Sequence, residues 1–186
     1  MSREPATLII LAGGEAKRMG FPKHQLVVDG RRVLNVLHER LAPLFVETLI
    51  VGQDIEDLPT GTRLVEDLYN IRAALVGIHA GLTASTTDLT FVVACDMPLV
   101  EPALVEYLLN QTHGFDVVVP IVRGYHEPLC AAYRRTCLEP IEGLIEVNVL
   151  KVSDCFAHVT LRAVPEEELR QLDLKFHSFV NINHAE

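Results

Sequence analysis

Cysteine is scarce in this sequence, and its spacing is not that of a zinc or redox site. Cys95, Cys130, Cys137 and Cys155 include no C-x-x-C pair. The pattern therefore supports neither a thioredoxin-like motif nor a zinc ribbon. We expect four buried, reduced thiols.

Long apolar segments are also missing. No stretch approaches the roughly 20 apolar residues that a membrane-spanning helix needs. The apolar part of the opening residues, MSREPATLIILAGG, is too short for a signal peptide. We therefore expect no membrane contact and a cytoplasmic location.

Positive charge is in deficit. Sixteen Lys and Arg residues stand against 25 Asp and Glu residues, which gives a formal net charge of -9. The overall field repels nucleic acid and anionic membrane surfaces, so we expect neither as a partner. An anionic ligand must be held by a local group of donors and cations.

The composition is that of an ordinary globular chain. Its 186 residues are 49% hydrophobic and 22% charged, enough to bury a sizeable core. The chain contains no internal repeat, low-complexity tract or convincing linker. We expect one compact domain over residues 1–186.

Short runs rich in Val, Ile and Leu alternate with segments of helical periodicity. The runs typical of buried strands are 7–11, 48–51, 63–65, 90–94 and 117–119. The helix-period segments are 33–44, 73–84 and 102–112. This alternation predicts an α/β fold: a mostly parallel, Rossmann-like sheet with helices on both faces.

The last third of the chain is less regular. We expect antiparallel additions to the sheet at 128–133 and 158–164, and a capped helix at 165–172. In sheets of this class, ligands bind at the carboxyl ends of the strands. Residues that directly follow a strand are therefore the candidates for chemistry.

The stretch LIILAGGEAKRMGFPK ends an apolar strand on two glycines and then presents Arg18 and Lys23. Gly13 and Gly14 would let a phosphate or sugar approach the main chain, whose N-H groups could bind it. The spacing is neither G-x-G-x-x-G nor a Walker loop. From these residues alone, a phosphate loop and a glycine turn followed by solvated cations remain equally open.

Asp96 directly follows the strand LTFVVAC, and Pro98 stops further extension. A lone carboxylate beside phosphates suits Mg²⁺, which takes one or two protein carboxylates and keeps several waters. A structural turn or helix cap is an equally good interpretation from the residues alone. His24, adjacent to the loop, could contact a phosphate, but a solvated side chain is the favoured interpretation.

Motifs in a fixed order run through nearly the whole chain. They are L-A-G-G-x-x-x-R-M-G-x-x-K at 11–23, V-E-D at 65–67, G-I-H-A-G-L at 77–82, C-D-M-P at 95–98, E-P-L-C-A-A-Y-R at 127–134 and F-V-N-I-N at 179–183. Together they resemble the molybdenum cofactor guanylyltransferases, within the nucleotidyltransferases of the glycosyltransferase-A type fold.

The resemblance implies an enzyme that uses Mg²⁺ to transfer GMP from GTP to the phosphate of molybdopterin or molybdenum-molybdopterin, releasing pyrophosphate. It implies nucleotide contacts at Leu11, Ala12, Gly13, Gly14, Lys23, Asp67 and Asp96. It implies catalytic roles for Arg18, Lys23 and Asp96, with Asp96 as the metal ligand, and acceptor contacts at Asn181 and Asn183. Cofactor-delivery proteins and chaperones specific for molybdoenzymes are possible partners.

Two departures from the family pattern keep alternatives open. Ala73 and Ala74 stand where Gly-Pro is usual, and the tail has N-I-N-H-A-E where N-I-N-T-P-E is commoner. A cytidylyltransferase of the same fold is one alternative. A catalytically silent nucleotide-binding partner in cofactor delivery is the other.

Overall fold

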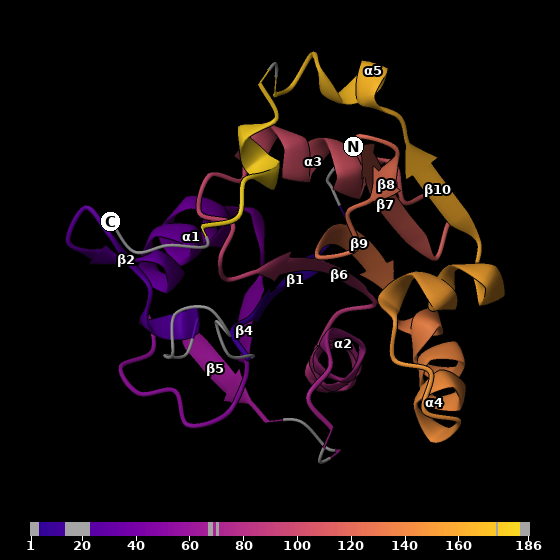
Figure 1. Cartoon of the computed structure of the whole chain (residues 1–186), viewed down its shortest axis with the longest axis horizontal. Coiled ribbons are helices and arrows are strands. Elements are labelled where there is room, and N and C mark those ends of the chain that lie inside the picture. Colours follow the sequence, from indigo (N-terminus) through magenta and orange to yellow (C-terminus); the bar gives the residue numbers. More distant parts are fainter. Residues whose placement is uncertain (1–3, 14–22, 67–68, 70, 174, 183–186) are drawn as a thin grey trace.

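The fold is described from a computed structural model, which describes residues 4–13, 23–66, 69, 71–173 and 175–182. A mixed β-sheet runs through these residues, with helices on both faces (Figure 1). Its strands lie in the order β10-β7-β9-β6-β1-β4-β5, and β8 pairs with β7. A separate two-stranded ribbon pairs β2 with β3.

The strands are β1 (Ala6–Leu11), β2 (Val27–Val28), β3 (Arg31–Arg32), β4 (Glu47–Val51), β5 (Thr62–Val65), β6 (Leu89–Ala94), β7 (Val117–Val122), β8 (Tyr125–His126), β9 (Cys130–Arg134) and β10 (Leu161–Val164). The α-helices are α1 (Val33–Leu41), α2 (Ala74–Ala84), α3 (Pro102–Asn110), α4 (Leu138–Glu146) and α5 (Glu166–Leu169). The 3-10 turns are η1 (Lys23–Gln25), η2 (Ala42–Leu44), η3 (Arg135–Cys137), η4 (Val152–His158) and η5 (His177–Phe179).

The predicted mostly parallel sheet is confirmed. Strand β1 pairs in parallel with both β4 and β6, and β4 pairs in parallel with β5. Strand β9 is antiparallel to β6 and β7, as expected for the segment 128–133. The expectation for 158–164 is wrong in direction, because β10 runs parallel to β7.

Helix boundaries differ from the expected ones at two places. The segment 33–44 divides at Leu41, and η2 follows because Pro43 lacks the N-H that a continuing α-helix needs. The expected helix 165–172 is shorter, since α5 covers Glu166–Leu169. Helix α4 was not expected; Pro140 and Gly143 within it obscure its helical pattern.

The central strands β1 and β6 are buried at every position, because most of their residues are apolar and helices cover both faces of the sheet. In β1, Leu8 and Ile10 belong to the core beneath α1 and α3, whereas Ile9 and Leu11 face α2 and α4. Figure 1 shows α1 and α3 above the sheet and α2 and α4 below it. This arrangement is the layered α/β architecture that the alternating pattern predicted.

Helix α2 approaches β1 closely through a glycine. A Cβ at Gly81 would lie 2.8 Å from Ile9 Cδ1, so a larger residue would force the helix away from the strand. At 11 residues, α2 is the longest α-helix in the described ranges, and none of those helices could cross a membrane.

Candidate functional site

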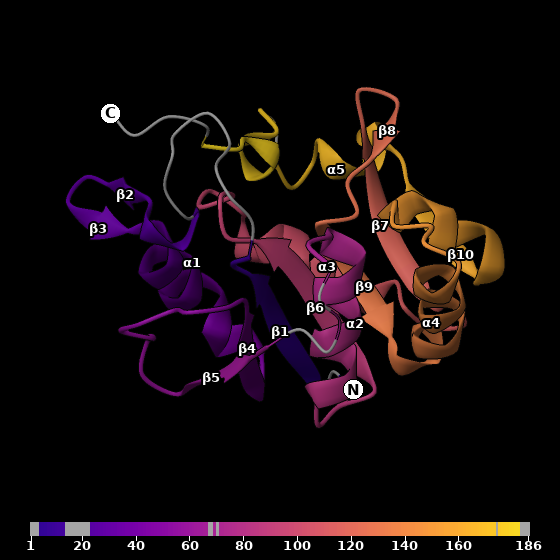
Figure 2. The same ribbon diagram turned by 60° about the horizontal axis from the view of Figure 1, so that its bottom comes forward.

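Four parallel strands end together at one edge of the sheet. The register pairs Leu11 with both Val51 and Ala94, and Val51 with Val65. The residues that follow β1, β4, β5 and β6 therefore meet at this carboxyl edge, which lies at the top of Figure 2. The signature loop and the C-D-M-P motif begin here, as the sequence predicted.

Ala12 and Gly13 do not offer their amides to a ligand. Their N-H groups donate to the carbonyl of Val51, at 2.8 and 3.1 Å. The expectation that these two N-H groups form part of an open phosphate cradle is therefore wrong. Leu11, the third described residue of the expected cradle, lies in β1 and pairs on both sides.

Gly52 makes close packing possible at this edge, and sequence reasoning missed it. A Cβ at Gly52 would lie 2.7 Å from Ile55 Cδ1, 3.2 Å from Gly13 N and 3.3 Å from the carbonyl carbon of Ala12. Its own N-H donates to the carbonyl of Val65 at 3.1 Å. A glycine directly after a buried strand was the available signal.

The expectation that His24 is solvated is also wrong. The residue is only 7% exposed, and its ring donates a hydrogen bond to the carbonyl of Ala12. Burial lowers the pKa of His24, and the nearby Arg32 guanidinium lowers it further. The contact holds η1, which begins at Lys23, beside the end of β1.

Several predicted site residues fall wholly or partly outside the described ranges. Gly14, Arg18, Asp67 and Asn183 lie outside the described residues. Lys23 is described as the first residue of η1, but its side chain is not described. The roles expected for these residues stay predictions.

Asp96 lies where its motif predicted. Asp96 is 3% exposed and follows β6. It lies next to the end of β1, because the preceding Cys95 N-H donates to the carbonyl of Leu11 at 3.0 Å. The described residues contain no group of three or more His, Cys, Asp or Glu that could hold a metal. A single carboxylate fits Mg²⁺ carried by a triphosphate, which needs few protein ligands.

Glu127 is a second carboxyl at the same edge. Strand β9 begins three residues after Glu127, at the carboxyl edge: Val93 pairs with Cys130, and Ala94 N-H donates to the carbonyl of Leu129 at 3.0 Å. Burial raises the pKa of Glu127, and the charge of Arg123 only partly opposes this shift. The motif at 127–134 formed part of the resemblance to the family, but this carboxyl was not singled out.

The C-terminal residues reach the edge beside Asp96. Ile182 N-H donates to the carbonyl of Asp96 at 2.9 Å, and the preceding Asn181 is exposed. Figure 1 shows this yellow segment returning from α5 past α3 towards α1. The structure therefore brings Ile182, the neighbour of Asn181, against the main chain of Asp96, although 86 positions separate Ile182 and Asp96 in the sequence.

The first turn of α2 faces the same edge. A Cβ at Gly77 would lie 3.2 Å from Leu11 Cδ2, which places the start of the helix beside the end of β1. No side chain caps α2 at its N-cap residue, Ala73. The positive end of the helix dipole adds to the local potential there. Ala73 has extended backbone angles (φ -145°, ψ 148°), which alanine adopts without strain.

The four cysteines are buried free thiols, as expected. Burial raises the pKa of Cys130 and Cys137, and it raises that of Cys155 to about 11. Because a thiol attacks as its thiolate, these residues are poor nucleophiles at neutral pH.

Comparison with known proteins identifies the family. Residues 8–157 match the model of the MobA-like NTP transferase domain. The chain belongs to the MobA-like NTP transferase family. The resemblance inferred from the motifs is thereby confirmed.

Curated relatives of this MobA-like chain match along nearly its whole length. The molybdenum cofactor guanylyltransferase of Desulfosudis oleivorans is 34% identical, with 98% of this chain and 92% of the relative covered. The probable molybdenum cofactor guanylyltransferase of Pelotomaculum thermopropionicum is 40% identical, with 96% of this chain and 87% of the relative covered.

Solved structures agree with this assignment. Molybdopterin-guanine dinucleotide biosynthesis protein A from Archaeoglobus fulgidus superposes with a TM-score of 0.82 at 27% identity, covering 95% of this chain and 92% of that one. A 4-diphosphocytidyl-2C-methyl-D-erythritol synthase from Anaerococcus prevotii superposes at 0.70 with 15% identity, covering 97% and 93%. The second match supports the nucleotidyltransferase fold alone.

Proposed function

We propose that this protein transfers GMP from GTP to the terminal phosphate of molybdopterin, or of its molybdenum form, and releases pyrophosphate. The observation that carries the proposal is a pair of main-chain hydrogen bonds at the carboxyl edge. Cys95 N-H donates to the carbonyl of Leu11, and Ile182 N-H donates to the carbonyl of Asp96. Segments proposed for nucleotide, metal and acceptor thus adjoin one another. The names of the curated relatives support the same activity.

The proposed reaction is an in-line displacement at phosphorus. An oxygen of the acceptor phosphate forms a bond to the α-phosphorus of GTP, while the bond from that phosphorus to the β-phosphate oxygen breaks. No general base is needed, because a phosphate monoester with a second pKa near 6 is mostly ionised at pH 7. The protein contributes by aligning the reactants and neutralising phosphate charge.

Each predicted residue has a role in this proposal. The main chain comes close to the nucleotide at Leu11, Ala12, Gly13 and Gly14. Because the N-H groups of Ala12 and Gly13 are already bonded, these two residues contribute only the space left by a methyl group and by the lack of a side chain. Arg18 and Lys23 neutralise phosphate charge, and Asp67 contacts the nucleoside. Asp96 would hold Mg²⁺, which supplies charge neutralisation when bound. Asn181 and Asn183 contact the acceptor.

A thermal-shift comparison tests the base assignment. With GTP, CTP, ATP and UTP added separately in the presence of Mg²⁺, we expect GTP to raise the melting temperature most. A ligand at 100 times its Kd stabilises the folded state by about 2.7 kcal/mol. Preferential stabilisation by CTP would instead favour the cytidylyltransferase.

A pyrophosphate-release assay tests turnover. With GTP, Mg²⁺ and molybdopterin, we expect pyrophosphate to form in proportion to the dinucleotide product. Binding of GTP without pyrophosphate release would favour the catalytically silent partner. A cytoplasmic location and delivery proteins as partners stay predictions within this proposal.

A further inference from the structure

We propose that Ser178 and Asp173 are positioning residues that couple acceptor binding to the metal site. The coupling joins the C-terminal segment, residues 175–182, to the β6–α3 loop, residues 95–101. It rests on the proposed function, because it assigns the loop to Mg²⁺ through Asp96 and the segment to the acceptor through Asn181.

The first link fixes the start of η5. Asp173 is 7% exposed, and its two carboxylate oxygens accept the N-H groups of His177 at 3.0 Å and Ser178 at 2.7 Å. An aspartate that accepts both amides holds the turn in one geometry. Ser178 is consequently presented at a defined position.

The second link crosses from η5 to the β6–α3 loop. Ser178 is fully buried, and its Oγ accepts the N-H of Glu101 at 3.0 Å, although 77 positions separate the two residues. Glu101 is the N-cap residue of α3, and α3 has no side-chain cap of its own. A buried hydroxyl from the C-terminal segment therefore fixes the end of this loop.

The third link returns to the metal residue. Ile182 N-H donates to the carbonyl of Asp96, at the opposite end of the loop from Glu101. From the other side, Arg40 Nε donates to the carbonyl of Val100 at 2.8 Å, and Arg40 also pairs with the Glu101 carboxylate at 2.7 Å. The C-terminal segment thus contacts both ends of a loop that α1 also holds.

These links have a functional consequence because of what they join. Asn181 is adjacent to Ile182, so an acceptor that orders Asn181 also orders the hydrogen bond to Asp96. Energetic coupling between two sites is reciprocal, so metal and nucleotide bound at Asp96 would favour the acceptor in turn. Loss of Ser178 Oγ weakens this coupling between the acceptor and metal sites without removing any group that touches either ligand.

The test replaces the hydroxyl and compares it with a matched change elsewhere. In Ser178→Ala, we expect the Mg²⁺ concentration for half-maximal thermal stabilisation by GTP to rise roughly three- to tenfold, the scale of one lost hydrogen bond. We expect a similar rise in the acceptor KM. The KM for GTP at saturating Mg²⁺ should be unchanged.

The matched control is Ser85→Ala, at the opposite edge of the sheet. Ser85 is also buried, and its Oγ accepts the N-H of Thr87 at 3.2 Å and donates to Thr7 Oγ1 at 2.9 Å. This variant should lower the melting temperature and leave the Mg²⁺ midpoint and the acceptor KM unchanged. Ser178→Thr keeps a hydroxyl and should restore both quantities towards wild type.

Amide hydrogen exchange gives a readout that needs no turnover. In Ser178→Ala without ligands, exchange should accelerate at Glu101 and Ile182 but not at the amides around Thr7 and Thr87; Ser85→Ala should show the reverse. Asp173→Asn should resemble Ser178→Ala, since it removes one of the two acceptors that place Ser178.

The outcomes separate this inference from the proposed function. If Ser178→Ala and Ser85→Ala lower the melting temperature alike and leave the Mg²⁺ midpoint and exchange at Ile182 unchanged, the coupling is overturned. A wild-type protein that binds GTP and Mg²⁺ but releases no pyrophosphate contradicts the proposed function. Exchange and the Mg²⁺ titration still decide the coupling in that case.

Discussion

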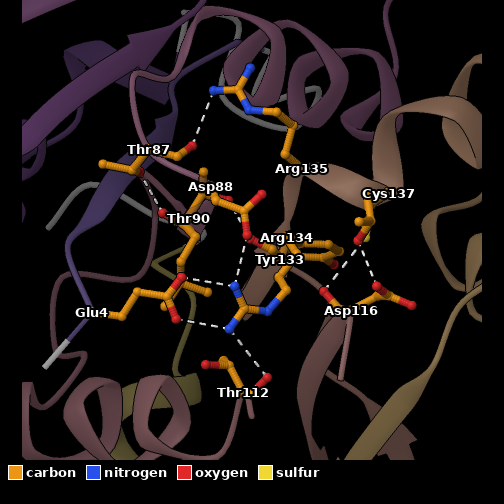
Figure 3. A network of polar contacts seen from close by, with 12 residues as sticks. Glu4, Thr87, Asp88, Thr90, Thr112, Asp116, Tyr133, Arg134, Arg135 and Cys137 are labelled. Atoms are coloured by element: carbon orange, nitrogen blue, oxygen red, sulfur yellow. Dashed lines mark hydrogen bonds and ion pairs between the residues drawn. The ribbon is translucent and has the colours of Figure 1, made fainter. Parts of the chain in front are cut away.

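The two edges of the sheet are built in opposite ways. At the amino edge, charged side chains neutralise one another: Arg134 binds both carboxylate oxygens of Glu4 at 2.9 Å and the Asp88 carboxylate at 2.8 Å (Figure 3). At the carboxyl edge, main-chain hydrogen bonds join Ala12, Gly13 and Gly52 to the neighbouring strands, with the Arg40–Glu101 ion pair beside them. The ion pairs of the amino edge therefore stabilise the fold.

Neighbouring contacts strengthen the same contrast. Glu47 accepts hydrogen bonds from Thr7, Thr86 and Arg63. Burial alone would raise the pKa of Glu47, but these hydrogen bonds outweigh it, so the pKa is lowered. Because Arg63 is already paired with Glu47, it is a poor partner for a phosphate. The difference teaches that the ion pairs of Glu47 and Arg134 belong to the scaffold, whereas the proposed site adjoins strand ends joined by main-chain hydrogen bonds.

The largest effect should come from removing the carboxylate proposed for Mg²⁺. In Asp96→Asn, which keeps the shape of the side chain, we expect pyrophosphate release to fall by roughly 10²- to 10³-fold, as when one preorganised charge is lost. Steady-state kinetics at saturating GTP and Mg²⁺ would measure this. Circular dichroism would show whether the fold is kept.

The matched control for this variant lies at the amino edge. Asp88→Asn removes an aspartate that pairs with Arg134 at 2.8 Å. We expect a lower melting temperature with turnover close to wild type. Equal turnover in Asp96→Asn and Asp88→Asn would remove Asp96 from the mechanism and erase the functional difference between the edges.

The parts of the molecule that sequence predicts are those with local patterns. Apolar runs and helical spacing located β1, β6 and α2 to within one residue at each end, because such patterns are set by neighbours in the chain. Asp96 was placed correctly because a residue that follows a parallel strand must lie at the carboxyl edge. These inferences need no knowledge of distant contacts.

Several features that the sequence did not reveal depend on partners elsewhere in the chain. Strand β10 runs parallel because of where it meets β7, about 40 residues earlier, and nothing in its own residues sets that direction. The amides of Ala12 and Gly13 looked open until Val51 was found to accept them both. His24 looked solvated for the same reason, since its partner is Ala12.

A smaller effect is expected from Gly52→Ala at the carboxyl edge. Ile55 can move, but the new methyl group would also press on backbone atoms of Ala12 and Gly13 at 3.2 to 3.3 Å. Overpacking of this kind costs about 1–3 kcal/mol. Urea unfolding should show that loss, and the Kd for GTP should rise; unchanged values of both would show that the edge tolerates displacement.

Arg134→Gln should lower the stability of the protein by an amount that depends on pH. Hydrogen bonds from Arg134 lower the pKa of Glu4. A lowered pKa in the folded state gives stability that is present above the unfolded value near 4.3 and is lost as the pH falls through the folded value. The Arg134–Glu4 contribution is therefore complete near pH 7 and fades below about pH 4.

The measurement is the free energy of unfolding by urea at pH 7 and at pH 3. Because Glu4 is 43% exposed and Asp88 is 53% exposed, solvent screening keeps the loss in Arg134→Gln to about 1–2 kcal/mol at pH 7. The difference from wild type should shrink at pH 3. A difference that is the same at both pH values would mean that packing, and not charge, is what Arg134 supplies.

The smallest effect should come from a glycine that belongs to neither edge, and its sign is opposite. A Cβ at Gly143, in the exposed face of α4, meets no atom within 4 Å. Gly143→Ala should therefore stabilise the protein by up to about 1 kcal/mol, through helix propensity and a less flexible unfolded chain. Urea unfolding would measure this, with Gly52→Ala as the matched glycine at the carboxyl edge. Because α4 packs mainly against α2, η3 and η4, turnover should be unchanged. A loss of turnover would show that the reaction depends on more of the fold than its carboxyl edge.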